Sequence, residues 1–273
     1  MADFILREYE KADIPALISL WTRTFGDSER LIREFFRLLP DMGSGVAAVR
    51  HGQVIGAAYA LTGMELANAG VDAPVCGYIY AVAVEEAHRR LGAGRALTVA
   101  AAELAKKRGA RVICTLPAEA SLYGWYKNIL GVDCALWRKK RRIQSAAIDP
   151  CLRLNAAEYG QRREAILQGR PHLRLSTPSL EFQWRLCEEY GGGFFACGSG
   201  IAAAYTDGSR GILRELLCAD KSEADKVAAS VGAALGTDEV LLCEPAGPGE
   251  GEPYIAALPG MIPPDCMWNL SFD

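Results

Sequence analysis

Residues 88–97, with the sequence HRRLGAGRAL, combine three arginines with glycines at positions 92 and 94. The apolar run VCGYIYAVAV at 75–84 precedes them and predicts a buried strand, while an apolar helical pattern follows them. The first turn of a helix exposes unpaired N–H groups and the positive end of the helix dipole, and glycine lets the backbone approach a ligand closely. A strand, R-x-x-G-x-G and a helix in this order predict a pyrophosphate cradle, although a plain turn before a helix would use the same glycines.

The residue types that bind metals or form disulfides show no supporting pattern. The nine cysteines form no CxxC motif, and their odd, scattered count argues against a disulfide framework and favours a reducing compartment. The three histidines have no metal-ligand spacing, so no metal site is expected.

Composition limits the class of partner. The 30 basic and 33 acidic side chains give a net charge of −3, which argues against nucleic acid as a partner. The one basic cluster, RKKRR at 138–142, is interpreted as a solvated edge or linker in preference to a binding patch. Charges inside the first ten residues exclude the apolar core of a signal peptide, and no charge-free apolar run reaches about 18 residues. We therefore expect a cytoplasmic protein without a membrane partner.

The elements that must position the glycine turn form a mixed α/β pattern. Residues 1–145 predict, in order, a strand, two helices, a hairpin, the strand 75–84, the glycine turn, a helix, a strand, a short helix and a strand. Residues 146–273 repeat this order, with GPGEGEP at 247–253 as a flexible loop and MWNLSFD at 267–273 as a terminal strand. We interpret the chain as two domains, 1–145 and 146–273, related by a diverged duplication; two unrelated α/β domains are the alternative.

The segment VAVEEAHRRLGAGRAL at 82–97 resembles motif A of the GNAT superfamily of acyl-CoA-dependent N-acetyltransferases, V-x-P-x-x-R-x-x-G-x-G followed by a helix. Val84, Arg89, Gly92 and Gly94 match, and Glu86 replaces the proline. LPAEASLYGWYKNILGV at 116–132 resembles the second signature of the family, although it has one extra residue before its glycine and Val132 in place of an aromatic residue. The second half resembles a degenerate GNAT domain, as in the first two domains of acetyltransferases of the enhanced-intracellular-survival type.

This resemblance implies an acetyl-CoA site on the first domain. The thioester and pantetheine would lie along the strand that ends at Val84, with the Val82 N–H polarising the thioester carbonyl. Backbone N–H groups of the glycine turn would hold the pyrophosphate. The implied set is Val82, Ala83, Val84, Arg89, Arg90, Leu91, Gly92, Ala93, Gly94 and Arg95. Direct attack by the amine needs no covalent intermediate, so Cys114 is expected to be a core residue.

The resemblance also implies catalytic residues. Tyr126 would donate a proton to the departing thiolate, with Tyr123, on the same helical face, as the rival acid. Glu119 would accept the amine proton through water. The C-terminal carboxylate, together with the side chain of Asp273, is a further candidate base, against the simpler interpretation of a frayed terminus.

The resulting hypothesis is an N-acetyltransferase that moves an acetyl group from acetyl-CoA to a primary amine of a small molecule or peptide. The second half would form one wall of the acceptor cleft, and oligomerisation is left open. Asp27 and Glu29 either meet a cationic acceptor or simply begin a helix. The alternative function is a non-catalytic acyl-CoA-binding or sensing module. A dinucleotide enzyme is disfavoured because R-x-x-G-x-G is not G-x-G-x-x-G.

Overall fold

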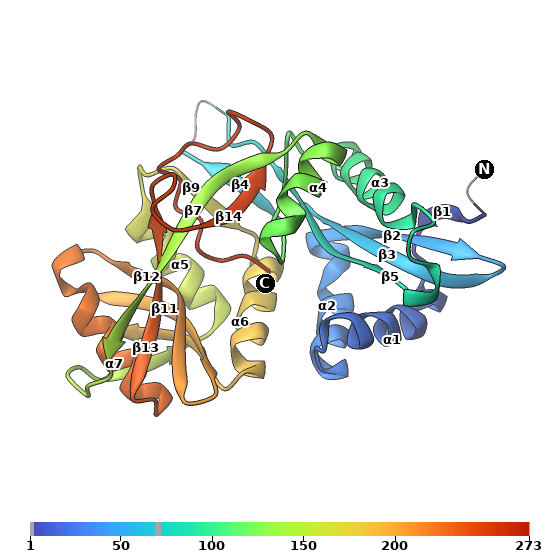
Figure 1. Cartoon of the computed structure of the whole chain (residues 1–273). Helices are drawn as coiled ribbons and strands as arrows, with labels where there is room; N and C mark the ends of the chain where they lie inside the picture. The colour runs from blue at the N-terminus through green and yellow to red at the C-terminus, as the bar shows by residue number, and fades with distance from the viewer. Residues whose placement is uncertain (1–2, 69–71, 273) are drawn as a thin grey trace.

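The computed structural model describes residues 3–68 and 72–272, which form two lobes joined through the middle of the molecule (Figure 1). The first half contains β1 (Ile5–Glu8), α1 (Ile14–Phe25), α2 (Glu29–Met42), β2 (Gly43–Arg50), β3 (Gln53–Leu61), β4 (Met64–Ala67), β5 (Cys76–Val84), α3 (Ala93–Lys107), β6 (Val112–Thr115), α4 (Ala120–Leu130) and β7 (Asp133–Gln144). The second half contains β8 (Cys151–Leu154), α5 (Ala156–Leu167), β9 (His172–Leu175), α6 (Thr177–Glu189), β10 (Gly193–Cys197), β11 (Gly200–Asp207), β12 (Arg210–Cys218), α7 (Ala224–Leu235), β13 (Glu239–Ala246) and β14 (Glu252–Ala257).

One mixed sheet runs through both lobes. Its twelve strands follow the order β1-β2-β3-β5-β6-β14-β7-β13-β12-β11-β10-β8, and β4 with β9 forms a small second sheet. β5 pairs in parallel with β6, and β12 with β13, and each of these crossovers contains a helix, α3 or α7. The order β1-β2-β3-β5-β6 of the first half recurs as β8-β10-β11-β12-β13 in the second, which supports a duplication. The predicted mixed α/β class is confirmed.

The strand β14 crosses from the second half into the sheet of the first. It lies between β6 and β7, with Ala256 opposite both Thr115 and Cys134. The sequence pattern did not identify this strand. It also predicted a terminal strand at 267–273, whereas the described part of that segment has only one bridge, between Met267 and His172. Trp268, Leu270 and Phe272 are instead fully buried between the lobes.

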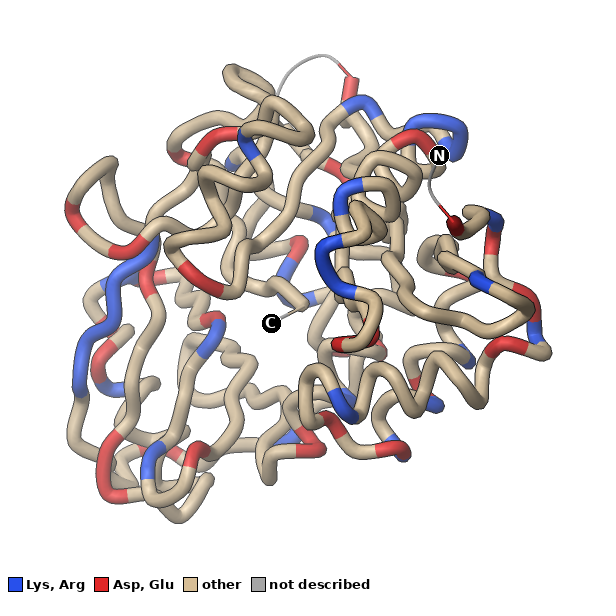
Figure 2. Tube along the Cα trace, turned by 45° about the vertical axis from the view of Figure 1, so that its right-hand side comes forward, with Lys and Arg blue, Asp and Glu red and all other residues tan. Residues whose placement is uncertain are grey.

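The basic run 138–142 lies on β7, in the middle of the sheet, and forms the longest blue stretch in Figure 2. Because β7 is hydrogen-bonded to both β14 and β13, the interpretation as an edge or linker is wrong. Acidic side chains of the neighbouring elements compensate its charge: Glu252 lies 2.7 Å from Arg138, and Asp225 lies 2.6 Å from Arg141. These acidic partners are more than 80 residues away along the chain, so the sequence shows no partner near the basic run.

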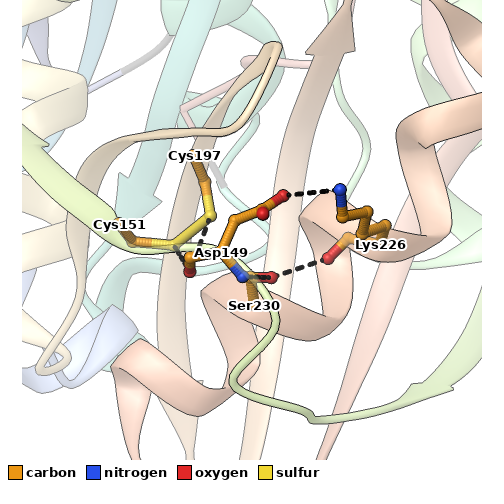
Figure 3. The surroundings of a disulfide bond; sticks show 5 residues. All are labelled: Asp149, Cys151, Cys197, Lys226 and Ser230. Atoms are coloured by element: carbon orange, nitrogen blue, oxygen red, sulfur yellow. Dashed lines mark hydrogen bonds and ion pairs between the residues drawn. A yellow bond between two sulfur atoms is a disulfide. The ribbon is translucent and has the colours of Figure 1, made fainter.

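A disulfide joins β8 to β10 through Cys151 and Cys197, which face each other directly in the strand register (Figure 3). The structure thus has a single bridge where the cysteine pattern predicted no framework. Asp149 attaches the segment before β8 to α7. Its N–H donates to the Ser230 hydroxyl at 3.1 Å, and its carboxylate pairs with Lys226 at 3.2 Å (Figure 3).

Replacing Cys151 with serine in the oxidised protein is expected to lower the free energy of unfolding by roughly 2–4 kcal/mol. The bond spans a sequence separation of 46 residues, and this cross-link restricts the unfolded chain. Urea unfolding followed by tryptophan fluorescence measures the effect. Repeating the titration with a reductant provides the control, since both proteins then unfold without the cross-link. An equal difference in both conditions would show that packing, and not the cross-link, causes the loss.

The largest apolar core joins the two halves on one face of the sheet. Phe35 of α2 lies 5.3 Å from Phe182 of α6, and Phe182 stacks on Phe272 with ring centroids 5.9 Å apart. Burial of such large aromatic side chains fixes the lobes and the C-terminal segment relative to each other. Among the helices of the described residues, none is long and apolar enough to cross a membrane.

Candidate active site

A bulge in β5 marks the centre of the site. Ala83 pairs with Ala57 and Tyr80 with Tyr59, so Ala81 and Val82 together face one residue of β3. Ala81 has a φ of +46°, which is unusual for a residue with a Cβ and shows that the surrounding structure enforces the bulge. The bulge re-aims the strand, and Val82 lines a cavity on the α4 side.

The two parallel strands β5 and β6 separate just before the bulge in β5. Their pairing covers Cys76–Tyr78, and the last link is the Thr115 hydroxyl, which donates to the Ile79 carbonyl at 2.9 Å. Beyond Tyr78, no other strand of the described chain pairs with this edge of β5. The exposed edge offers backbone N–H and C=O groups to an extended ligand, in the manner of an added strand.

The glycine turn lies at the end of β5 and begins α3. Gly92 is the N-cap residue, with a φ of +81°, and no side chain caps the helix. A Cβ at Gly92 would meet no atom within 4 Å, so the turn faces open space. Arg90 also has a positive φ, +67°. The N–H groups of the first turn of α3 are therefore available to an anion.

Three arginines surround this turn without an acidic partner. Across residues 3–68 and 72–272, no carboxylate lies within 4.0 Å of the guanidinium groups of Arg89, Arg90 or Arg95. Arg89 instead donates to the Val84 carbonyl at 3.4 Å. Glu85, one turn earlier, is paired with Arg23. The predicted turn residues thus form a cationic, open helix start, which suits an anionic ligand.

A cavity of about 640 Å³ lies between the separated strands, α4 and the C-terminal segment. It brings together the predicted residues Val82, Glu119 and Tyr126 with Asp27 of the loop before α2. Tyr123, the rival acid, also lines it. The wall includes side chains that the sequence did not indicate, among them Trp21, Tyr80, Arg138, Lys140, Glu252 and Phe272.

The two candidate acids on α4 have different surroundings. Tyr126 is 8% exposed, and burial raises the pKa of its phenol, an effect that the Thr115 hydroxyl partly opposes. Tyr123 donates its hydroxyl proton to the Tyr254 carbonyl of β14 at 3.0 Å, and burial also raises its pKa. The Tyr123 proton therefore has a backbone partner and ties α4 to β14. Both phenols are neutral at pH 7 because a raised pKa favours the protonated form.

The carboxylates differ in position. Glu119 is exposed at the N-cap of α4, lines the cavity and accepts from the Ser121 hydroxyl at 3.2 Å. Asp27 also lines the cavity, where it accepts from the Trp21 indole N–H at 2.7 Å and from the Tyr190 hydroxyl at 3.0 Å. The helix cap at this point is Ser28. Glu29 is not among the residues that line the cavity, and it pairs with Arg33.

The C-terminal segment reaches the cavity from the second half. Phe272 lines it, with ring centroids 5.7 Å from Tyr78 and 5.6 Å from Tyr80. Ser271 accepts from the Tyr254 hydroxyl at 2.6 Å, and its carbonyl accepts from Gln183 at 3.1 Å. Asp273, a predicted catalytic residue, lies outside the described residues.

Two further predictions concern metal and cysteine chemistry. Within the described part of the chain, no group of three or more histidine, cysteine or acidic side chains could hold a metal ion. Cys114 is fully buried in the core, as expected for a structural residue. Burial raises the pKa of its thiol well above the ordinary value, which suppresses the thiolate.

Comparison with known proteins assigns the first half to a family. Residues 6–127 match the model of an acetyltransferase (GNAT) domain, so the chain carries a GNAT acetyltransferase domain. No curated protein matches the chain.

Solved structures extend the likeness to both halves. A GCN5-related N-acetyltransferase from Kribbella flavida superposes with a TM-score of 0.67 at 15% identity, over 93% of this chain and 71% of that one. One from Anabaena variabilis gives 0.66 at 14% identity, over 93% and 72%. Eis1 from Mycobacterium abscessus gives 0.58 at 18% identity, over 88% and 65%. These superpositions show that the fold is shared across both lobes, consistent with a tandem arrangement.

Proposed function

We propose that this GNAT domain uses acetyl-CoA as acyl donor and acetylates a primary amine of a small molecule or peptide. The observation that carries the proposal is the succession of three features: the open edge of β5, the glycine turn and the cavity that contains Tyr126. The separated edge of β5 leads from Val82 to the open turn at Gly92, and the phenol of Tyr126 faces the same cavity as the bulge. A binding module would need the first two features, whereas a buried neutral phenol beside them suits proton transfer.

The reaction is a direct transfer. The amine nitrogen attacks the thioester carbonyl, the new C–N bond forms and the C–S bond breaks. In our proposal the Val82 N–H stabilises the negative charge on the carbonyl oxygen, because the bulge removes it from the regular β3 ladder. The Tyr126 phenol then donates a proton to the departing thiolate.

The amine must lose a proton to react. We propose that Glu119 accepts it through water, because its carboxylate lines the cavity and is exposed to solvent. The C-terminal carboxylate with Asp273 is the second candidate base, since the segment that precedes it enters the cavity at Phe272. Unchanged turnover after deletion of the last two residues would exclude the C-terminal carboxylate and leave Glu119 as the base.

The halves contribute differently to this site. Residues 1–145 would bind the donor, whereas residues 146–273 would complete the acceptor side through β14 and the C-terminal segment. Glu252 and Phe272 are the second-half side chains that support this division, since both line the cavity.

The experiment that tests the proposed function is a screen of primary amines for release of the CoA thiol from acetyl-CoA. Product mass should increase by one acetyl group on the amine. Binding of acetyl-CoA without thiol release for any amine would reject catalysis.

Replacing Asp27 with asparagine is expected to raise KM for a cationic amine roughly tenfold, with a smaller change in kcat. The carboxylate is held in the cavity by Trp21 and Tyr190 and can attract the ammonium form of the acceptor. Glu29→Gln is the matched control, because its side chain pairs with Arg33 outside the cavity and should leave KM unchanged. Equal KM values for the Asp27 variant and the natural protein would contradict a role in acceptor binding.

A further inference from the structure

A second cavity, of about 310 Å³, adjoins the candidate active site. Arg138 and Lys140 of β7 line both cavities, so the cleft continues along the sheet face into the second lobe. Its floor is formed by alternate side chains of the neighbouring strands, including Ile212 of β12 and Leu241 of β13. Tyr254 and Asn269 border it.

This second cavity is rich in positive charge. The cations on its wall are Arg138, Lys140, Arg210 and Arg214, and its one acidic side chain is Asp207. The Glu252 carboxylate pairs with both Arg138 and Lys140, at 2.7 and 3.2 Å. Arg210 is half-buried, and no carboxylate of the described residues lies within 4.0 Å of its guanidinium. A partly buried guanidinium of this kind favours an anionic ligand.

The charge differs along the cleft. Asp27 and Glu119 line the end that contains Tyr126, whereas the far end contains Arg210. Such an arrangement is complementary to a molecule with a cationic amine at one end and an anion at the other. The apolar floor between them, with Ile212 and Leu241, suits the connecting part of that molecule.

We propose that the second cavity binds a carboxylate of the acceptor, so that the acceptor is an amine with a carboxylate at its far end, as in a short peptide. This inference rests on the proposed function. The distance can be counted in strands from β6, which borders the end of the cleft that contains Tyr126. In the sheet, β7 lies two strands from β6, roughly 10 Å away, and β12 lies four strands from β6, roughly 19 Å away. An extended peptide spans about 3.3–3.6 Å per residue, so about five to six residues would connect the reacting amine with a carboxylate at Arg210.

The test compares hexaalanine with its C-terminal amide, which has the same reacting amine and lacks the carboxylate. We expect kcat/KM to be about tenfold higher for the free acid, the effect of one charge-assisted hydrogen bond. Arg210→Gln should bring this ratio close to one. Arg162→Gln, which removes an exposed arginine from α5, is the matched control and should keep the ratio.

Calorimetric titration of both peptides into the CoA-saturated protein separates this inference from the proposed function. Tighter binding of the acid, lost in Arg210→Gln, would support the subsite even if no amine is acetylated. Equal binding and turnover of acid and amide, a ratio unchanged in Arg210→Gln, or no binding of either peptide would overturn it.

Discussion

Replacing Tyr126 with phenylalanine is expected to lower kcat about 100-fold, the low end of the range for general acid catalysis. The low end applies because the leaving group is a thiolate, whose thiol has an ordinary pKa near 8.5, so its departure needs less assistance than that of an alkoxide. Binding of acetyl-CoA should change little, since the phenol ring and its packing are retained. Thiol release at saturating acetyl-CoA and amine measures kcat, and calorimetric titration measures donor binding.

Tyr123→Phe is the matched control. Its hydroxyl bonds to the Tyr254 carbonyl, so the variant should lose about 1 kcal/mol of stability and keep most of its turnover. A similar fall in kcat for both variants would show that the phenols act through the structure of α4. Full activity of Tyr126→Phe would exclude Tyr126 as the acid.

The pH dependence provides a second criterion for Tyr126. The acid must be protonated to act, and burial raises the pKa of its phenol above the ordinary value of 10.0. The loss of activity through Tyr126 ionisation is therefore expected above pH 10, while the natural protein keeps its acid form at pH 7–9. A fall in kcat centred near pH 8 that disappears in Tyr126→Phe would contradict this assignment.

The sequence was sufficient for the parts of the site that depend on local pattern. The strand 76–84, the turn at Gly92 and the helix from Ala93 are contiguous, so periodicity and glycine position determine them together. Tyr126 and Glu119 were implied by the family resemblance, and they belong to one short helix and its cap, so the sequence also places them close together. Their catalytic roles stay a prediction. The bulge at Ala81 lies within the predicted strand, but nothing in the sequence indicates that this alanine has a positive φ.

The missing parts depend on contacts between distant segments. β14 follows the loop 247–251, and its neighbours β6 and β7 precede it by more than 100 residues, so no local signal places it between them. The same crossover puts Glu252 beside Arg138, and Arg138 and Lys140 of the basic run form part of the wall of a cleft. The aromatic residues Trp21 and Phe272 belong both to the core and to the cavity wall, and no local pattern indicates the second role.

Replacing Gly92 with glutamate is expected to weaken acetyl-CoA binding by 100-fold or more. The substitution places a negative charge at the first turn of α3, where Arg89, Arg90 and Arg95 and the free N–H groups would hold the pyrophosphate. Repulsion replaces attraction at that point, and a side chain occupies the open space in front of the helix. Calorimetric titration with acetyl-CoA measures the dissociation constant, and added salt should weaken binding to the natural protein because the arginines are exposed.

Two controls separate charge at the cradle from backbone strain. Gly92→Ala imposes a similar cost of about 1–2 kcal/mol for the left-handed φ without the charge, and should retain much of the affinity. Gly109→Glu places the same side chain on a glycine with a φ of +91° at the other end of α3, where no atom lies within 4 Å of its Cβ. If Gly109→Glu weakens binding as much as Gly92→Glu, the loss comes from α3 as a whole. If only Gly92→Glu loses acetyl-CoA binding, the anion site is the start of α3 itself. Both variants introduce the same charge and a similar backbone strain next to the same helix, but only Gly92 lies at the end where the helix dipole is positive.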